Sequence, residues 1–296
     1  MAEANTAIWR ADSYAKINLG LHVLEKLPTG YHLIETGFAF IDWKDRITLQ
    51  AAEEDKLEMS EEEIPTDRSN LVWKAVDILD RYVGLPSKYH ISVEKKIPAG
   101  AGLGGGSSNA ATVLRMVNKA EVLGLSTEDL VDLSRNLGAD VPFFLYGQTG
   151  IGSGLGQDIE LTDLQPDTWI LTVFPGIHSS TAEAYKWAIP SGKEEEDLSL
   201  KSTLLDSPYE EWPYFLRNDL EKSVFQEHEL VGNLKDQIME FGAVYSAMSG
   251  SGSAVYGLFE QDFVAFEALK AFNELDFRAN ITKPKFRPDY GIYRID

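Results

Sequence analysis

The sequence predicts an α+β protein of two domains. Segments with apolar residues at every second position are mixed with segments at helical spacing, without the regular strand–helix alternation of α/β folds. The 296 residues are enough for roughly two domains, and 44% of them are hydrophobic, so a sizeable core can be buried. The composition shifts near residue 158, and we therefore expect one domain over residues 1–158 and a second over residues 159–296.

The first elements are expected to be strands. Residues 15–23 alternate between apolar and polar side chains, which predicts a strand with one buried face. After a turn at 27–30, the same alternation predicts a second strand at 34–40, and residues 46–51 predict a third. The acidic residues 53–63 are expected to form a solvated loop or a hairpin tip.

A helix, a strand and a second helix follow. Ser69 has the side chain of an N-cap, and apolar residues at helical spacing over 72–83 predict a helix that stops at Gly84. Residues 89–97 predict a strand, and residues 107 to about 122 predict a helix.

The remaining elements are marked by caps, glycines and apolar runs. Ser126 and Asp129 form a capping-box pattern that opens another helix, which we expect to end at 138–144. Glycine recurs over 147–156, which indicates closely approached strands or bulges. Beyond residue 158 we expect strands at 169–174 and 254–259, an exposed acidic insertion at 193–197, and helices around 218–226, 230–241 and 262–275.

Charge and composition exclude several classes of function. The chain has 27 Lys and Arg against 47 Asp and Glu, a net charge of −20, so we expect neither nucleic acid nor an anionic membrane as a partner. Without cysteine, disulfides, thiolate metal sites and cysteine nucleophiles are excluded. No signal peptide and no apolar run of membrane-spanning length is visible, so a soluble cytoplasmic protein is the default expectation. The sequence gives no signal for the oligomeric state.

A glycine-rich segment between a predicted strand and a predicted helix carries the strongest functional signal. Glycine lets backbone N–H groups close around an anion, and the positive end of the helix dipole adds to the attraction. The segment is neither a Walker motif nor a dinucleotide fingerprint. A flexible linker is the alternative, although linkers rarely join a strand to a capped helix. We therefore predict a phosphate-binding loop formed by Pro98, Ala99, Gly100, Ala101, Gly102, Leu103, Gly104, Gly105, Gly106, Ser107 and Ser108.

This segment resembles the central motif of the GHMP kinases, a superfamily that includes galactokinase, homoserine kinase and mevalonate kinase. Residues 14–19, 30–32 and 137–144 resemble the motifs of one family within it, the kinases that phosphorylate 4-diphosphocytidyl-2-C-methyl-D-erythritol. The resemblance implies a two-domain GHMP kinase fold. Its N-terminal ATP-binding domain would be ribosomal protein S5 domain 2-like and its C-terminal domain α/β-plait-like, with the active site in the cleft between them.

Two residues are candidates for catalysis. Lys16 shares the polar face of its strand with Asn18, and on pattern alone a solvated strand face is the alternative. Asp140 lies between an apolar helix and Val-Pro-Phe-Phe, where it could instead cap a turn. The resemblance implies that Asp140 takes the proton of the acceptor hydroxyl. It also implies that Lys16 lies beside the acceptor, where a cation would offset developing negative charge. Asn18 joins the expected substrate site.

The resemblance also implies a cytosine pocket. Tyr31 could stack on a pyrimidine, and His32 could read the edge of the base by hydrogen bonds. Without the resemblance, an ordinary loop is the alternative for this triplet. Tyr185 could supply the opposite face of the stack, with Thr181 beside it, although helix packing is the alternative for Tyr185.

Further residues are expected around ATP. The resemblance places Asn70 and a lysine just before the glycine loop near the adenosine, and Lys95 and Lys96 are the candidates, with solvated surface as the alternative for either. Ser107, Ser108 and Asn109 could cap their helix, contact phosphate or ligate Mg²⁺. The sequence assigns no metal ligand among them.

The C-terminal half matches the family more loosely. Residues 249–253 resemble its third, glycine-containing motif, for which a tight turn is the alternative, and Asn218-Asp219-Leu220-Glu221 resembles a motif whose role looks structural. Residues 150–156 lack an arginine that many relatives carry, and residues 190–213 look like an acidic insertion. These departures concern contacts on the substrate side.

The expected activity is transfer of a phosphoryl group from ATP, with Mg²⁺, to the 2-hydroxyl of 4-diphosphocytidyl-2-C-methyl-D-erythritol. The products would be ADP and the 2-phosphate, in non-mevalonate isoprenoid biosynthesis. Another small-molecule kinase of the superfamily, acting on mevalonate, homoserine or a sugar, is one alternative. A nucleotide-binding regulator without turnover is another, although the presence of both Lys16 and Asp140 argues against it.

Overall fold

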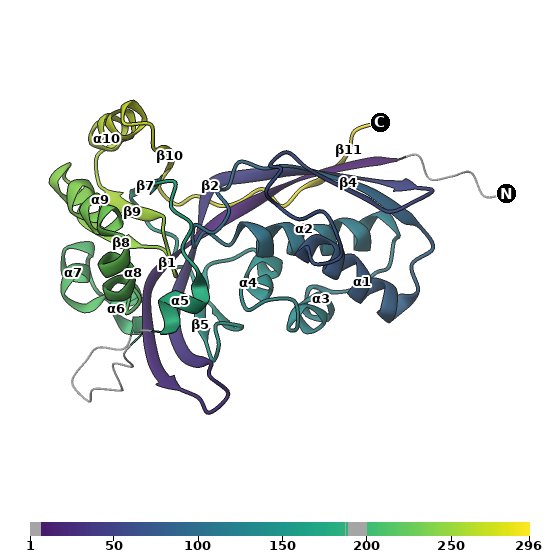
Figure 1. The fold of residues 1–296 in the computed structure, drawn as a ribbon, viewed down its shortest axis with the longest axis horizontal. Helices are drawn as coiled ribbons and strands as arrows, with labels where there is room; N and C mark the ends of the chain where they lie inside the picture. Colours follow the sequence, from purple (N-terminus) through teal and green to yellow (C-terminus); the bar gives the residue numbers. More distant parts are fainter. Residues whose placement is uncertain (1–6, 187, 189–199) are drawn as a thin grey trace.

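The computed structural model describes residues 7–186, 188 and 200–296. The elements form two sheets that meet near the middle of the molecule, a long one with helices on one face and a shorter one with helices on its outer side (Figure 1). The acidic run predicted as an insertion at 193–197 lies outside the described residues. None of the helices formed by described residues has the length and apolar composition needed to cross a bilayer.

The first sheet is built on one long hairpin. Strands β1 (Ile8–Lys26) and β2 (His32–Ala52) pair along nearly their whole length. The path of the sheet is β11-β1-β2-β4-β3, and β5 and β6 extend it from β2. The remaining bounds are β3 (Lys56–Met59), β4 (Lys88–Glu94), β5 (Gly150–Ser153), β6 (Asp158–Leu161) and β11 (Ile292–Arg294).

Three of the strand predictions were wrong in detail. The two strands expected at 34–40 and 46–51 are one strand, because a shift in register between Ile41 and Lys44 bulges the chain without ending the pairing. The acidic segment 53–63 contains β3, which pairs in parallel with β4. Strand β1 is buried on both faces over 13–23, because the second sheet and its helices cover the side that we expected to be solvated.

Helices α1 to α4 cover one face of the first sheet (Figure 1). Their bounds are α1 (Leu71–Val83), α2 (Gly105–Ala120), α3 (Thr127–Ser134) and α4 (Val141–Tyr146). The capping box at Ser126 and the stop at Gly84, whose φ is 69°, are confirmed. The N-cap of α1 is Asn70 and not Ser69, because the Asn70 side chain accepts from Val72 N. The helix that opens at Ser126 ends at Ser134 and not at 138–144, and residues 141–144 instead begin α4.

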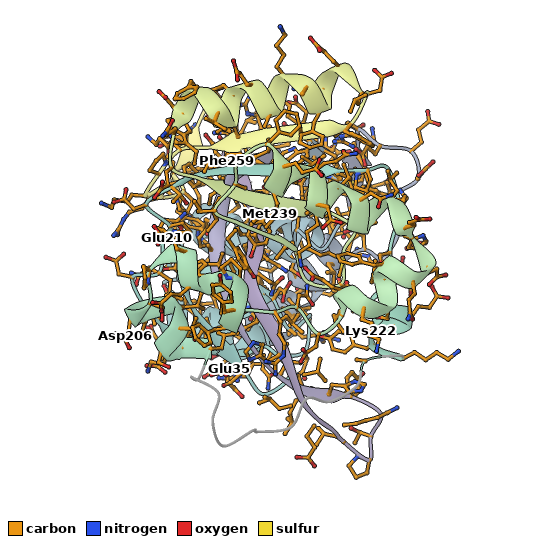
Figure 2. All side chains as sticks on the ribbon, turned by 90° about the vertical axis from the view of Figure 1, so that its left-hand side faces the viewer. Glu35, Asp206, Glu210, Lys222, Met239 and Phe259 are labelled. Carbon is orange, nitrogen blue, oxygen red and sulfur yellow. The ribbon has the colours of Figure 1, made fainter. Side chains whose placement is uncertain are left out.

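The second sheet is antiparallel, with strand order β10-β7-β9-β8. Helices α8, α9 and α10 pack on its outer side, and Figure 2 looks onto this face, with Lys222 on α8 and Met239 on α9. The strands are β7 (Trp169–Phe174), β8 (Tyr245–Met248), β9 (Val255–Phe259) and β10 (Arg278–Thr282). The helices are α5 (Thr181–Lys186), α6 (Leu200–Asp206), α7 (Trp212–Phe215), α8 (Glu221–Glu227), α9 (Glu229–Glu240) and α10 (Asp262–Glu274), with a 3₁₀ turn at Tyr209–Glu211.

This sheet with its helices is the expected α/β-plait-like half. The predicted strands at 169–174 and 254–259 and the last three predicted helices are confirmed within a few residues. The short strand β8 was missed, and residues 249–253 therefore connect two strands and not a helix and a strand.

The two halves are not separate along the chain. Strand β6 and the C-terminal strand β11 both follow residue 157 yet pair within the first sheet. One apolar cluster joins the two halves, with Ile17 from β1 and Tyr256 from β9. The domain boundary expected at residue 158 stays a prediction. Dividing the chain at that position would separate β6 and β11 from the sheet that they complete.

Candidate active site

A large cavity lies where the two sheets meet. Its volume is about 1460 Å³, which is ample for a nucleotide and a second ligand. The glycine loop 98–107 forms one wall, and Lys16 and Asn18 of β1 lie on the floor. Other walls come from the 138–140 turn, the loop 250–252 and the start of α5. The cavity thus collects segments from both halves of the chain.

The glycine loop is a left-handed turn that runs into α2. Gly100, Gly102 and Gly104 have φ values of 62°, 74° and 69°, which disfavour any side chain. Gly104 is the N-cap of α2, so the free N–H groups of the first turn belong to residues that line the cavity. The helix begins at Gly105 and not at Ser107 as expected. The geometry is that of an anion cradle.

Lys16 lies buried beneath this loop. Its Nζ donates to Asn18 Oδ1 at 2.5 Å and to Gly102 O at 2.9 Å, and it lies 3.5 Å from Asp140 Oδ2. Burial lowers the pKa of Lys16, and the neighbouring Asp140 carboxylate opposes that shift. A single cation therefore connects the glycine loop, β1 and Asp140.

Asp140 is the residue just before α4. Its side chain makes no capping hydrogen bond to that helix, so the capping role considered from the sequence is not the one it has. The carboxylate is 29% exposed, pairs with Lys16 and lines the cavity. It is thus held on one side by Lys16 and open to a ligand on the other.

Asn18 is fixed from three directions. Its Nδ2 donates to Thr36 Oγ1 at 2.9 Å, its backbone N donates to Ser249 Oγ at 3.3 Å, and its backbone O accepts from Tyr256 at 2.9 Å. The amide orientation follows, because Oδ1 must then face the Lys16 ammonium. Asn18 therefore holds Lys16 in place.

The residues predicted for a cytosine pocket line the same cavity. Burial raises the pKa of the Tyr185 hydroxyl, and the Asp140 carboxylate is near enough to raise it further. Tyr31 is 65% exposed at its rim, whereas His32 is buried. The ring that stacks on Tyr185 is that of His32, with centroids 5.4 Å apart and planes at 27°. His32 Nε2 is buried and has no hydrogen-bond partner among the described residues, and burial together with Lys26 lowers the pKa of His32. Thr181 Oγ1 lies 2.9 Å from Ser251 Oγ in the same wall.

The residues predicted for adenosine are only partly brought together. Asn70 lines the cavity, but its side chain caps α1 and donates to Pro65 O at 2.6 Å. Lys95 also lines the cavity, but its ammonium group is buried in an ion pair with Asp45. Lys96 is exposed, pairs with Glu94 at 3.3 Å and lies outside the large cavity.

The polar residues that open α2 have different surroundings. Ser108 is buried and donates to Tyr14 O at 2.6 Å, and Asn109 donates to Asp45 Oδ2 at 2.9 Å, so both hold α2 to the sheet. Ser107 lines the cavity, and its hydroxyl would lie 3.6 Å from a Cβ placed on Gly138. Of the three, Ser107 is the one whose hydroxyl borders the anion cradle.

Two features of the site were missed from the sequence. Asp45 accepts from Lys96 N at 2.7 Å, from Ile97 N at 2.8 Å and from Asn109, and so ties both ends of the glycine loop together. Asn218 donates to the loop 249–253 and is treated below. A lone acidic residue within an alternating strand was the available signal for Asp45, and its distant partners could not be read from spacing.

Comparison with known proteins agrees with this geometry. The family model described as "GHMP kinases N terminal domain" matches residues 70–148, and "GHMP kinases C terminal" matches residues 200–275. A 4-diphosphocytidyl-2-C-methyl-D-erythritol kinase of Chlorobium chlorochromatii is 40% identical over 287 residues, covering 95% of this chain and 99% of that protein. One of Chlorobium phaeobacteroides is 41% identical, covering 93% and 96%.

A solved structure gives the same result. The crystal structure of a 4-(cytidine 5'-diphospho)-2C-methyl-D-erythritol kinase superposes with a TM-score of 0.77 at 31% identity, covering 92% of this chain and 98% of that one. The matches run through both halves, as do the cavity walls. The chain therefore belongs to the 4-diphosphocytidyl-2-C-methyl-D-erythritol kinase family of the GHMP kinases.

Proposed function

We propose that this protein transfers the γ-phosphoryl group of ATP to the 2-hydroxyl of 4-diphosphocytidyl-2-C-methyl-D-erythritol. The observation that carries the proposal is one continuous cavity that is lined both by the anion cradle with the Lys16–Asp140 pair and by the His32–Tyr185 stack. The named activity of the relatives supports the same substrate.

In the proposed reaction, Asp140 accepts the proton of the acceptor hydroxyl as the hydroxyl oxygen attacks the γ-phosphorus, and the bond from the γ-phosphorus to the β–γ bridging oxygen breaks so that ADP leaves. Lys16 stabilises the Asp140 carboxylate and the negative charge on the transferred group, since its ammonium lies 3.5 Å from Oδ2 beneath the loop. The glycine loop holds the phosphates through backbone N–H groups. Because phosphoryl transfer depends mainly on positioning and charge neutralisation, we assign the larger share of catalysis to the loop and Lys16.

The base end of the substrate is assigned to the part of the cavity lined by His32 and Tyr185. The buried, unpartnered Nε2 of His32 supports a hydrogen bond to a cytosine edge, and the Tyr185 ring supports stacking. Tyr31 at the rim would cover the base from the solvent side, and Thr181 would contribute a hydroxyl. Asn70 is assigned to the adenosine end of ATP because it lines the cavity. Lys96 is assigned to the same end only because it comes just before the glycine loop in the sequence.

Mg²⁺ fits this donor set as the companion of ATP. Among the described residues, no group of three or more His, Cys, Asp or Glu side chains is placed to hold a metal ion. Mg²⁺ commonly uses one or two protein oxygens together with phosphates and water. Ser107 lines the cradle, and its hydroxyl is the protein oxygen that we propose for it. When bound, Mg²⁺ would neutralise charge on the phosphate oxygens.

Two further expectations concern the partners of the protein and its location. A net charge of −20 disfavours nucleic acid as a partner, and we place the reaction in the cytoplasm, where ATP is supplied.

The test is release of ADP by the purified protein with Mg·ATP and one acceptor per reaction. We expect release with 4-diphosphocytidyl-2-C-methyl-D-erythritol and not with methylerythritol phosphate, mevalonate, homoserine or galactose. Release with a different acceptor would reject the cytidine pocket. ATP binding without release in any reaction would favour a regulator without turnover.

A further inference from the structure

The side chain of Asn218 holds the loop 249–253 from behind. Its Nδ2 donates to Met248 O at 2.9 Å and to Gly250 O at 2.8 Å, and its Oδ1 accepts from Leu220 N at 3.0 Å. The side chain is buried, and these partners fix the orientation of the amide, since only Nδ2 can donate to two carbonyls. Loss of its donors would leave two buried carbonyls unsatisfied.

The segment that carries Asn218 is attached to β1. Leu21 N donates to Arg217 O at 2.8 Å, and Asp219 N donates to Leu21 O at 2.9 Å, so residues 217–219 lie beside the strand that bears Lys16. The chain then turns into α8, where the exposed Lys222 points away from the molecule (Figure 2). Asn218 therefore spans the space between β1 and the loop.

The loop that Asn218 holds lies against the catalytic pair. A Cβ placed on Gly250 would lie 2.9 Å from Asn18 Oδ1 and 3.4 Å from Lys16 Nζ. Ser249 Oγ donates to Gly102 O at 2.9 Å, the same carbonyl that accepts from Lys16. At the other end of the loop, Ser251 contacts Thr181. The loop thus touches the ATP side, Lys16 and the proposed substrate side at once.

We propose that Asn218 is a positioning residue for phosphoryl transfer. By fixing the carbonyls of Met248 and Gly250 it holds the loop against Lys16 and Asn18, and so sets where the acceptor hydroxyl lies relative to the γ-phosphate. The inference rests on the proposed function. A displacement of about 1 Å at such a point can cost about 100-fold in rate, even when the residue touches neither substrate.

Two substitutions of Asn218 distinguish its effect on the loop 249–253 from its effect on the local fold. Asn218→Asp keeps the oxygen that accepts from Leu220 N but replaces both donors by an acceptor facing two carbonyls. Asn218→Ala removes both functions. We expect kcat to fall about 10- to 100-fold in both variants, and KM for the cytidine substrate to rise. The Kd for Mg·ADP should stay unchanged, because the glycine-loop amides are not held by Asn218.

The matched control is Asp219→Asn. Asp219 is the next residue of the same segment, and its carboxylate accepts from Val23 N of β1 at 2.7 Å through Oδ2 and from Arg217 Nε at 2.9 Å through Oδ1. We expect Asp219→Asn to lower Tm without lowering kcat. A kcat for Asn218→Asp equal to the wild-type value, or a loss matched by Asp219→Asn, would overturn the proposal.

Hydrogen exchange gives a readout that does not depend on activity. The amides of Ser249, Gly252 and Ala254 are hydrogen-bonded within or beside the loop. In Asn218→Asp we expect faster exchange at these amides, with exchange in α2 unchanged. If the wild-type protein proved inactive with every acceptor, the proposed function would fail and the catalytic role of Asn218 with it. An active wild type with unchanged exchange in the variant would reject the positioning role alone.

Discussion

Lys16 Nζ and Asp140 Oδ2 lie 3.5 Å apart, although 124 positions of sequence separate the two residues. The ammonium reaches Asp140 from beneath the glycine loop, because its two hydrogen bonds to Asn18 and Gly102 aim it there. The pair gives the cavity one proton acceptor and one cation at the point where the loop ends.

Removing either charge should abolish most turnover. Lys16→Met and Asp140→Asn keep the approximate shapes of the side chains, and we expect each to lower kcat about 100-fold or more. Mg·ADP binding, measured by calorimetry, should persist. Lys44→Met is a suitable control because Lys44 pairs with Asp12 at 3.2 Å outside the large cavity. Wild-type turnover in both active-site variants would contradict the assigned roles.

The rate should fall at alkaline pH. Burial lowers the pKa of Lys16 from its ordinary value of 10.5, and its charged form is the protonated one. The cation is therefore lost as pH rises through a pKa below 10.5, and kcat should fall with it. The same shift means that the unfolded chain holds this proton more tightly, so the contribution of Lys16 to the free energy of unfolding rises with pH over that window. An alkaline fall that persists in the residual activity of Lys16→Met would assign it to another group.

The aromatic ring of Tyr185 should govern affinity for the cytidine substrate. Tyr185→Phe keeps the ring that stacks on His32, whereas Tyr185→Leu removes it. Base stacking is worth about 1–3 kcal/mol, so we expect Tyr185→Leu to raise the substrate KM by about tenfold or more. Tyr185→Phe should change it little, and KM for ATP should be unaffected by either. An equal rise of the substrate KM in Tyr185→Leu and Tyr185→Phe would show that the hydroxyl, and not the stacking ring, governs affinity.

A methyl group at Gly102 should not be tolerated. Its Cβ would collide with the backbone carbonyl of Ser249, and its φ of 74° already disfavours a side chain. We expect Gly102→Ala to lose both activity and stability. Gly84→Ala separates the two causes, since Gly84 has a φ of 69° but open space around its Cβ position. That variant should lose only about 1–2 kcal/mol of stability in denaturant titration and keep its activity.

Removing one partner of the buried Asp45–Lys95 pair should destabilise the protein more than replacing both partners. Asp45→Ala would leave the Lys95 ammonium without its carboxylate and free the N–H groups of Lys96 and Ile97. We expect a loss of about 3–5 kcal/mol in the free energy of unfolding, measured by urea titration. The double change Asp45→Asn with Lys95→Met should recover part of that loss. A double variant no more stable than Asp45→Ala would mean that the backbone contacts of Asp45 outweigh its charge.

Local signals in the sequence predicted much of this fold. The capping box at Ser126 and the stop at Gly84 depend on neighbours within a few residues, and both were found. The N-cap was placed one residue early because Ser69 and Asn70 are both good caps, and only tertiary packing chooses between them. Strand β2 was divided because the apolar alternation breaks between Phe40 and Arg46, where residues 42 and 43 form a bulge and the pairing continues.

The residues of the site were predictable where they belong to a sequence motif. The glycine loop and the motifs around Lys16 and Asp140 led to residues that the structure brings together. Contacts over long separations in sequence were not predictable. Neither the partnership of Asp45 with Asn109 nor that of Asn218 with Gly250 has a local pattern. His32 was expected to face the base beside Tyr31, and its stacking on Tyr185 depends on how α5 packs.

The length of the central hairpin has a mechanical consequence. Strands β1 and β2, of 19 and 21 residues, pass from the helices of the first half into the apolar cluster shared with the second. The two strands pair along nearly their whole length, although three register shifts interrupt the ladder, and such pairing resists bending between the halves. We therefore expect ligands to enter by movement of rim side chains such as Tyr31, and not by a hinge between two rigid lobes.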